Sequence, residues 1–222
     1  MAEGPAHPVR TVRTVRWLHQ VHGSTVVVVP SPGEGDPQPT SGPGPGPGDA
    51  DGHLVRGVAA GEGDALVSAN GATGLAVLTA DCASIALGSP EGVAAAVHAG
   101  WRGLVAGVVE RAAEAMVVLG ATALVGALGP CVHPGCYEFS PSDLDQVAAR
   151  YGDQVRGRTV EGRPALDLPA AVAAALAAAG VRQQTGVDAC TGCGGGYFSH
   201  RARGDVGRQA LVVWSSPQGA TG

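Results

Sequence analysis

The stretch VAAAVHAGWRG at residues 93–103 constrains the fold of this chain more than any other. It begins as a run of small apolar residues, the pattern of a buried strand. His98 lies within this run, and Trp101 and Arg102 follow it just before a helical pattern at residues 104–119. Side chains that stand between a buried strand and a helix are often functional, although His98 taken alone fits a core histidine better than a ligand.

Other segments show strand and helix patterns in mixed order. Strands are expected at residues 24–29, 64–68, 74–80, 84–87, 123–128 and 209–214. Helices are expected at residues 140–150, with Ser140 as N-cap and Pro141 at the first helical position, and at residues 167–180. Because strands do not alternate regularly with helices, the order favours α+β layers over a doubly wound sheet.

Two segments show no periodic pattern. Residues 1–16 are polar and rich in Arg and Thr, and residues 30–52 consist largely of Pro, Gly and Ser. The second segment buries too little apolar surface to offset its ordering entropy, so we expect a flexible surface loop. With 222 residues, the chain suffices for one well-packed core, and residues 1–222 are interpreted as a single domain.

Composition excludes several classes of protein. The net charge is −5 and the basic residues are scattered, which argues against a nucleic-acid surface or a membrane-binding patch. All 14 basic residues are arginine. Without lysine, the chain cannot form a Walker A loop, a Schiff-base enzyme or a Ser-Lys hydrolase. The composition favours no particular oligomeric state.

The apolar runs, the N-terminal sequence and the cysteines predict in which cellular compartment the protein is found. No apolar run approaches the roughly 20 residues that span a bilayer, and the N-terminus does not read as a secretory signal. The chain has five cysteines, an odd number that fits reduced thiols in the cytoplasm better than a disulfide scaffold.

Three residues stand where strand patterns meet a glycine or a break: His22, Cys82 and His98. If those strand ends are neighbours in one sheet, two imidazoles and a thiolate would converge. This is a suitable ligand set for Zn²⁺, and a fourth position left for water would make the site catalytic. The alternative is two core histidines and a buried thiol.

Six motifs in order resemble the YfiH family, also called the polyphenol oxidase or laccase-domain family. They are QVHG at 20–23, DALV at 64–67, TADC at 79–82, AVHAGWRG at 96–103, GPC with CYE at 129–138, and CT with FSHR at 190–201. The resemblance runs from Trp17 to Trp214. It implies a cytosolic, single-domain, layered α/β/β/α sandwich, similar to the catalytic domain of cytotoxic necrotizing factor.

The resemblance also implies an activity. The family is associated with phosphorolysis of adenosine, inosine and methylthioadenosine, and with deamination of adenosine at the same site. Its metal-binding and catalytic residues fall on His22, Cys82 and His98. The expected cofactor is zinc, with copper as the alternative, and the expected partners are a purine nucleoside and phosphate.

Further site residues come from their positions beside these motifs. Arg102 and Arg201 are candidates for binding phosphate, because the guanidinium group suits that geometry. Asp81, next to Cys82, is a candidate catalytic residue that orients a ligand histidine or acts as a base; a turn role fits it equally. Asp64 is a weaker candidate of the same kind.

The chain departs from the family in two places. Members carry a longer N-terminal segment with a Ser-x-Arg-x-Gly-Gly pattern, which suggests a shortened N-terminus here or a gene start placed too far downstream. The Pro/Gly-rich insertion after Val29 is the second departure.

Other functions were weighed. A metal-free cysteine hydrolase would use Cys82 as nucleophile and His98 as base, in agreement with a peptidoglycan-editing role in the family. A degenerate paralogue would only bind a partner. True multicopper oxidases need His-x-His pairs, which this chain lacks. Cys190 and Cys193 suggest a zinc ribbon, but Cys131 and Cys136 are spaced too far apart to be its second pair, so the roles of these four cysteines stay open.

Overall fold

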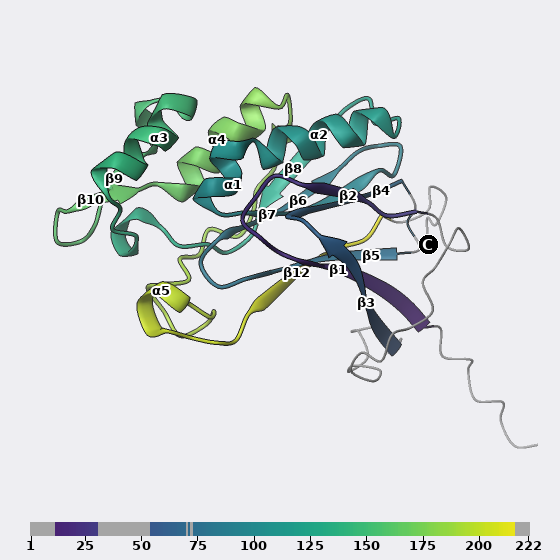
Figure 1. Cartoon of the computed structure of the whole chain (residues 1–222), viewed down its shortest axis with the longest axis horizontal. Helices are drawn as coiled ribbons and strands as arrows, with labels where there is room; N and C mark the ends of the chain where they lie inside the picture. The colour runs from purple at the N-terminus through teal and green to yellow at the C-terminus, as the bar shows by residue number, and fades with distance from the viewer. Residues whose placement is uncertain (1–11, 31–53, 70, 72, 216–222) are drawn as a thin grey trace, which may run out of the picture.

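The computed structural model describes residues 12–30, 54–69, 71 and 73–215, and the structural statements below refer to these residues. Most of the loop expected at residues 30–52 therefore lies outside the described residues. Two β-sheets stack face to face, and helices cover one of them (Figure 1).

The first sheet has four strands, in the order β12-β5-β1-β3. Its central strand β1 pairs in parallel with both β3 and β5, and β12 pairs antiparallel with β5. The strands are β1 (Val12–His19), β3 (Leu54–Glu62), β5 (Thr73–Thr79) and β12 (Gln209–Val213).

The second sheet has six strands, in the order β11-β8-β6-β7-β4-β2. Its middle strands β8, β6, β7 and β4 are antiparallel neighbours, whereas β2 and β11 add in parallel at the edges. The strands are β2 (Val26–Val28), β4 (Ala65–Ser68), β6 (Ala83–Gly88), β7 (Ala94–Ala99), β8 (Val125–Leu128) and β11 (Arg182–Gln183).

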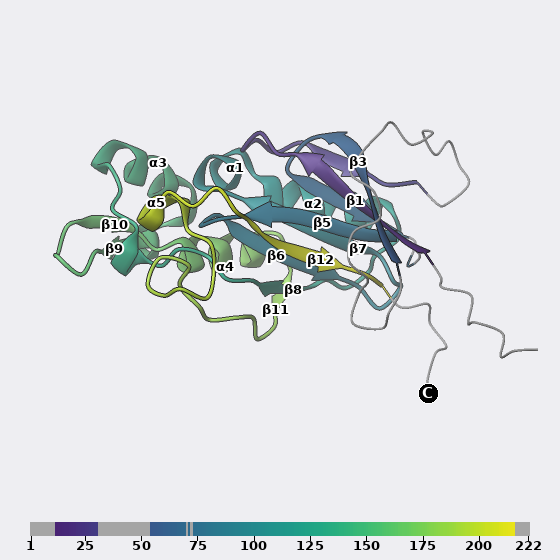
Figure 2. The same ribbon diagram turned by 90° about the horizontal axis from the view of Figure 1, so that it is seen from below.

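The helices α1, α2 and α4 lie over the outer face of the six-stranded sheet, and α3 packs against α1 and α4 at one end of this layer (Figure 1 and Figure 2). These helices are α1 (Trp101–Ala106), α2 (Val108–Val118), α3 (Pro141–Tyr151) and α4 (Leu168–Ala178). The short helix α5 (His200–Arg203) precedes β12 and lies near the beginning of that strand. Smaller elements are the hairpin of β9 (Arg156–Arg158) and β10 (Pro164–Leu166), and the 3₁₀ turns η1 (Pro134–Cys136) and η2 (Asp153–Val155).

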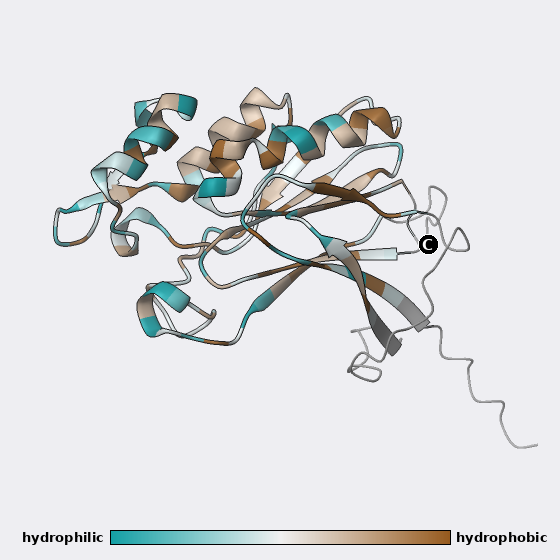
Figure 3. Ribbon diagram, viewed as in Figure 1, coloured by the Kyte–Doolittle hydropathy of each residue, from teal (hydrophilic) through white to brown (hydrophobic). Residues whose placement is uncertain are grey.

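Strand alternation divides the core into two parts. In β4, Ala65 and Val67 face the helices, whereas Leu66 packs with Leu75 and Val77 of the other sheet. Such alternation follows from the two-residue period of a strand. Figure 3 shows β2 among the most hydrophobic segments and hydrophilic residues gathered on α3 and α5. The layered α+β sandwich expected from the resemblance is confirmed, with α5 as the only described helix on the side of the four-stranded sheet.

The structure corrects two expectations. The helix expected at residues 104–119 begins at Trp101 and is divided at Gly107, whose φ of 83° ends α1 and starts α2. Residues 12–16, expected to be irregular, belong to β1. This strand lies between β3 and β5, so hydrogen bonds on both sides stabilise it regardless of its own polar pattern.

Helix termini agree with the sequence. The Ser140 side chain accepts from the backbone N–H of Asp143 at the start of α3, and Asp167 caps α4 in the same way through Ala170. Among the described helices, none has the length and apolar character needed to cross a membrane.

Candidate metal centre and active site

Strand pairing in the six-stranded sheet brings the candidate residues to one place. Cys82 directly precedes β6, and His98 is the fifth residue of β7, which pairs antiparallel with β6. Asp64 directly precedes β4, the other neighbour of β7, so the antiparallel register places it opposite His98. The backbone N–H of His98 donates to the carbonyl of Asp64 at 2.7 Å. Neighbouring strands thus carry Asp64, Cys82 and His98 to the same edge.

His22 reaches this edge from the turn between β1 and β2. Its φ of 60° lies in the left-handed region, which is uncommon for a residue with a side chain. The Asp64 carboxylate holds the turn, because it accepts from the backbone N–H groups of His22 at 2.9 Å and of Gly23 at 2.7 Å. A strained backbone held by a buried acid is a feature found often at functional sites.

The same carboxylate orients His98. Asp64 Oδ1 lies 2.8 Å from His98 Nδ1, and both side chains are almost completely buried. This contact leaves Nε2 of His98 as the ring nitrogen able to bind a metal ion. A ligand histidine whose other nitrogen is fixed by a carboxylate is the usual arrangement in zinc sites.

One donor atom from each of His22, Cys82 and His98 lies within 4.8 Å of the other two. The two imidazole rings meet edge to face, with centroids 4.9 Å apart. Gly100 borders this group: a Cβ atom there would stand 3.1 Å from His22 Cδ2 and 3.2 Å from Cys82 Sγ. Two nitrogen donors and one sulfur donor at this separation fit a tetrahedral Zn²⁺ ion with one position left over. We call these three residues the His-Cys-His centre.

Burial differs among the three residues of the His-Cys-His centre. His98 is buried, Cys82 is partly buried and His22 is exposed. The centre therefore has a closed side formed by the sheet and an open side at the His22 turn. A small molecule could approach a bound metal ion only from the open side.

The hydrogen bonds shift the pKa values within the centre. Burial raises the pKa of the Cys82 thiol, but the contacts with His22 and His98 lower it by more, to about 6. Burial lowers the pKa of His98, whereas Asp64 and the Cys82 thiolate raise it to about 9. For Asp64, burial raises the pKa, yet the bonds from His98 and Gly23 hold it below its usual range. The centre favours a thiolate, the form that binds metals.

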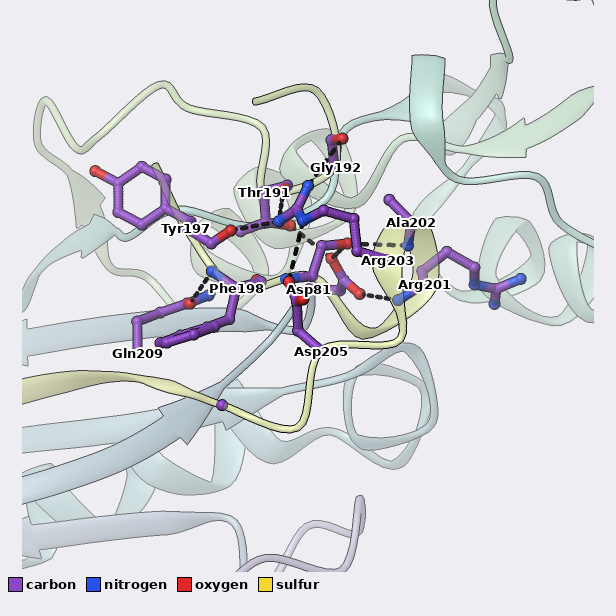
Figure 4. A network of polar contacts seen from close by, with 12 residues as sticks. Asp81, Thr191, Gly192, Tyr197, Phe198, Arg201, Ala202, Arg203, Asp205 and Gln209 are labelled. Carbon is purple, nitrogen blue, oxygen red and sulfur yellow. Dashed lines mark hydrogen bonds and ion pairs between the residues drawn. The ribbon is translucent and has the colours of Figure 1, made fainter. Parts of the chain in front are cut away.

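The contacts of Asp81 fit the turn role that the sequence also allowed for it. Its Oδ1 accepts from the hydroxyl groups of Thr191 at 2.7 Å and Ser199 at 2.6 Å, and its Oδ2 accepts from the Arg201 backbone N–H at 2.6 Å (Figure 4). Both oxygens therefore bind the C-terminal segment, and the φ of Asp81 is 104°. Asp81 fixes the loop before Cys82, whereas the residue that orients a histidine is Asp64.

The two candidate phosphate ligands lie on an aromatic wall made of Trp101, Tyr137 and Phe139. The rings of Trp101 and Tyr137 both meet Phe139 edge to face, with centroids 5.5 Å and 5.1 Å away. The Arg102 guanidinium carbon lies 4.4 Å from the Trp101 ring centroid, and that of Arg201 lies 5.1 Å from the Tyr137 centroid. Figure 4 shows the Arg201 side chain pointing away from the hydrogen bonds around Asp81.

Electrostatics connects this aromatic wall with the His-Cys-His centre. Burial raises the pKa of Tyr137 to about 12, and the negative charge of Cys82 adds to this, whereas the positive charges of Arg201 and Arg102 oppose it. The pKa of Tyr137 therefore depends on the charge of the Cys82 thiolate and on the charges of the two arginines. Both guanidinium groups are exposed and lie within electrostatic range of the same phenol.

The sequence singled out three residues that the structure brings together, whereas the acid in contact with His98 is Asp64 and not Asp81. His22, Cys82 and His98 meet as expected, and their roles as ligands stay a prediction. Asp64 was the weaker candidate because strand pairing, not spacing along the chain, places it opposite His98. A sign was present in the sequence, since Asp64 is a charged residue at the start of a buried strand.

The chain is similar to known proteins over most of its length. Residues 6–216 match the family described as multi-copper polyphenol oxidoreductase laccase. Purine nucleoside phosphorylase SCO2081 of Streptomyces coelicolor is 38% identical over 203 residues, which are 90% of this chain and 74% of that protein. Purine nucleoside phosphorylase ORF3 of Streptomyces griseus is 39% identical over 213 residues, 95% of this chain and 75% of that protein.

A solved structure supports the fold. The crystal structure of hypothetical protein YfiH from Bacillus licheniformis matches with a TM-score of 0.70 at 20% identity, over 91% of this chain and 74% of that one. At this identity the likeness shows the fold alone, while the sequence match shows the family. This chain therefore belongs to the multi-copper polyphenol oxidoreductase laccase family, the family of YfiH.

Proposed function

We propose that this protein is a zinc-dependent purine nucleoside phosphorylase that also deaminates adenosine. The observation that carries the proposal is the meeting of two imidazoles and a thiol within 4.8 Å, with Asp64 bound to Nδ1 of His98 so that Nε2 is left free. The relatives in Streptomyces are named purine nucleoside phosphorylases, which gives the substrate class. The proposed nucleosides are adenosine, inosine and methylthioadenosine.

His22, Cys82 and His98 would hold the metal ion. When bound, Zn²⁺ supplies a Lewis acid that polarises a coordinated oxygen or lowers the pKa of water. The polypeptide contributes orientation: Asp64 sets the tautomer and the direction of His98, and it fixes the His22 turn through two backbone bonds. Copper is the alternative ion, because a Cys-His set also accepts it.

Arg102 and Arg201 would bind phosphate. Both guanidinium groups are exposed and lie on the aromatic wall beside the centre, where a phosphate could receive two charge-assisted hydrogen bonds. In phosphorolysis, a phosphate oxygen bonds to C1′ of the ribose as the glycosidic bond to the purine breaks. The purine leaves with a proton, and ribose 1-phosphate remains. In deamination, water replaces the amino group of adenosine and ammonia leaves.

One observation favours a second function. The chain of contacts from Asp64 through His98 to Cys82 has the order of a catalytic triad, with an acid, a base and a thiol nucleophile. A cysteine hydrolase acting in peptidoglycan precursor editing would need only this series of contacts between Asp64, His98 and Cys82. The second imidazole, His22, is unnecessary in a triad, and its approach to the same thiol favours a metal site over a metal-free triad.

The deciding experiment incubates the purified protein with adenosine, with and without inorganic phosphate. We expect adenine and ribose 1-phosphate only when phosphate is present, and inosine in both cases. The same assay is run on His22→Ala, which removes a proposed ligand. His19→Ala is its control, because His19 is exposed in β1 and is not among the three residues of the centre. Full turnover in the absence of stoichiometric metal, with activity surviving chelation, would replace this proposal with the triad. No turnover of any purine nucleoside would favour the degenerate binding protein.

The location follows from the same observations. All five cysteines are free thiols in the structure, and the proposed Cys82 ligand needs the reduced state. Both points support the cytoplasmic location that we propose.

A further inference from the structure

A second group of metal-ligating side chains lies apart from the His-Cys-His centre. It consists of Cys136 at the end of η1, and of Cys190 and Cys193 in a turn more than fifty residues later in the chain. Their three sulfur atoms all lie within 4.8 Å of one another. We call this group the three-cysteine cluster. Cys131 is buried in the core and does not belong to it.

The turn at Cys190 has the hydrogen bonds of a metal-binding knuckle. The Cys190 sulfur accepts from the backbone N–H of His133 at 3.3 Å. Burial raises the pKa of this thiol, but nearby N–H donors, His133 foremost, lower it by more, which stabilises a thiolate over a thiol. A Cys-x-x-Cys turn that points both sulfurs to one side is the common half of a structural zinc site.

Gly192 permits the third sulfur to approach. A Cβ atom at this position would stand 2.7 Å from Cys136 Cβ and 3.2 Å from Cys136 Sγ. No residue with a side chain could therefore bring the turn and η1 so close without a shift. The backbone is shaped to fit Cys136 against the Cys-x-x-Cys turn, which chance clustering of thiols would not require.

A disulfide accounts for fewer of these features than a metal ion does. Cys136 Sγ and Cys193 Sγ lie 2.9 Å apart, and both are free thiols. A disulfide would use only these two sulfurs and would leave Cys190, which accepts from the N–H of His133, without a role. A thiophilic ion uses all three.

We propose that Cys136, Cys190 and Cys193 bind a second zinc ion, with three thiolate ligands and a fourth position open to solvent. Binding releases the protons of the thiols that are still protonated and involves no change of oxidation state. Cys193 is exposed, so the open position faces water. Zn²⁺ suits this set because soft thiolate ligands select it over magnesium or calcium.

The second ion would secure the segment that carries Arg201. Thr191, within the Cys-x-x-Cys turn, is fully buried, and its hydroxyl donates to Asp81 next to Cys82. The Arg203 guanidinium donates to the Thr191 carbonyl at 3.2 Å and so joins α5 to the same turn. A metal ion at the three-cysteine cluster would thus clamp η1 to the C-terminal turn and hold one border of the His-Cys-His centre in place.

The test measures zinc bound per chain in the full-length protein and in two serine variants. Wild type should bind about two ions, and Cys193→Ser and Cys82→Ser should each bind about one. Cys131→Ala is the matched control, a neighbouring cysteine outside both groups, and should keep the wild-type content. If the proposed function is wrong about zinc, wild type should bind one ion that persists in Cys82→Ser and vanishes in Cys193→Ser.

Cobalt gives a readout that does not depend on activity. With Co²⁺ as the probe, charge-transfer absorption in the near ultraviolet grows with the number of thiolate ligands. Cys193→Ser should therefore lose more of this absorption than Cys82→Ser, which removes a single thiolate. Circular dichroism of both variants checks that the loss does not reflect unfolding.

Chemical protection covers the case of a variant that fails to fold. In wild type at pH 7, zinc should protect Cys190 and Cys193 from alkylation, and a chelator should expose the two together. Equal zinc content in wild type and Cys193→Ser, or alkylation unaffected by chelation, would overturn the proposal. A disulfide between Cys136 and Cys193 in metal-free protein purified without reductant and kept from air would do so as well.

Discussion

The His-Cys-His centre and the three-cysteine cluster flank the same C-terminal segment, yet they are built in different ways. The first takes its ligands from the ends of adjacent strands and from a turn held by a buried carboxylate. The second would take all its ligands from loops and short turns, and backbone N–H groups stabilise the sulfur of Cys190. With two neutral imidazoles, the first centre carries only the negative charge of its one thiolate. The three thiolates of the second carry more negative charge than a divalent ion carries positive charge.

This difference separates chemistry from support. A centre with two neutral ligands leaves a bound ion electron-poor, which suits activation of a substrate oxygen. A centre with three thiolates offsets that charge, so even with an open fourth position it suits support of the C-terminal segment better than activation of a substrate. Asp81 connects them, because it binds Thr191 and Arg201 of the C-terminal segment and precedes Cys82 in the chain.

The largest expected effect separates the two centres by ligand removal. His98→Ala should abolish nucleoside turnover and remove one metal ion, because it deletes a ligand and leaves Asp64 buried without its partner. The three-cysteine cluster should keep its ion. Metal analysis and product assays on the same preparation measure both effects. His200→Ala, a substitution on exposed α5, is the control for loss of an imidazole. Retention of full turnover in His98→Ala would remove this residue from the mechanism.

The second prediction uses thiol reactivity in the metal-free protein. The pKa of Cys82 is lowered to about 6, while the contact with Cys193, together with burial, raises that of Cys136 to about 12. At pH 7 about nine-tenths of Cys82 should be thiolate, against a minute fraction of Cys136. Alkylation of Cys82 should therefore fall as the pH drops through about 6, and Cys136 should stay largely unlabelled at pH 7.

Peptide mapping by mass spectrometry measures the labelling of each cysteine. Buried Cys131, whose pKa is raised to about 12, is the internal standard for an unreactive thiol. Equal labelling of Cys82 and Cys131 across this range would show that the two histidines do not stabilise a thiolate.

Part of this comparison could be predicted from the sequence. The three residues of the His-Cys-His centre each stand at the junction of a strand pattern and a glycine or a break, and the family resemblance predicts that they are metal ligands. Such positions are visible along the chain because strand ends have local signals. Asp64 was ranked too low, since its contact with His98 depends on which strands are neighbours in the sheet.

The three-cysteine cluster could not be predicted in the same way. A zinc ribbon needs two pairs of cysteines, so Cys131 and Cys136 were considered only as a second pair and were rejected because of their spacing. In the structure Cys131 points into the core and only Cys136 meets the Cys-x-x-Cys turn. One sulfur from one loop and two from another leave no characteristic spacing. The broken helix at Gly107 is a similar case, because its left-handed φ arises from packing and not from the apolar period.

The third prediction weakens the first centre without removing a ligand. Asp64→Asn should lower its metal affinity about 10–100-fold, the usual cost of losing a partner that orients a ligand histidine. An amide has one acceptor oxygen and cannot serve the N–H groups of His22, Gly23 and His98 as the carboxylate does. Competition with a chelator measures the affinity. Asp145→Asn, a surface position paired with Arg156, is the control. Unchanged affinity would show that Asp64 serves only the fold.

The sign of the pH dependence follows from the same carboxylate. The pKa of Asp64 is lower in the folded protein than its ordinary value, so its contribution to stability is present above that ordinary value. It should be lost as the pH falls through the lowered pKa. The Asn variant should therefore lose less stability than wild type on acidification, as denaturant unfolding at each pH would show.

The smallest effects come from one added methyl group at each centre. In Gly100→Ala the new Cβ would stand 3.1 Å from His22 Cδ2 and 3.2 Å from Cys82 Sγ, atoms that can yield by a few tenths of an ångström. We expect its metal affinity to fall by less than about tenfold. In Gly192→Ala the new Cβ would stand 2.7 Å from Cys136 Cβ, which is close to the backbone and cannot move alone. We therefore expect a loss of about tenfold at the three-cysteine cluster, and chelator competition on the two variants compares them directly. A larger loss at Gly100 than at Gly192 would mean that the strand-end centre is the less adaptable of the two.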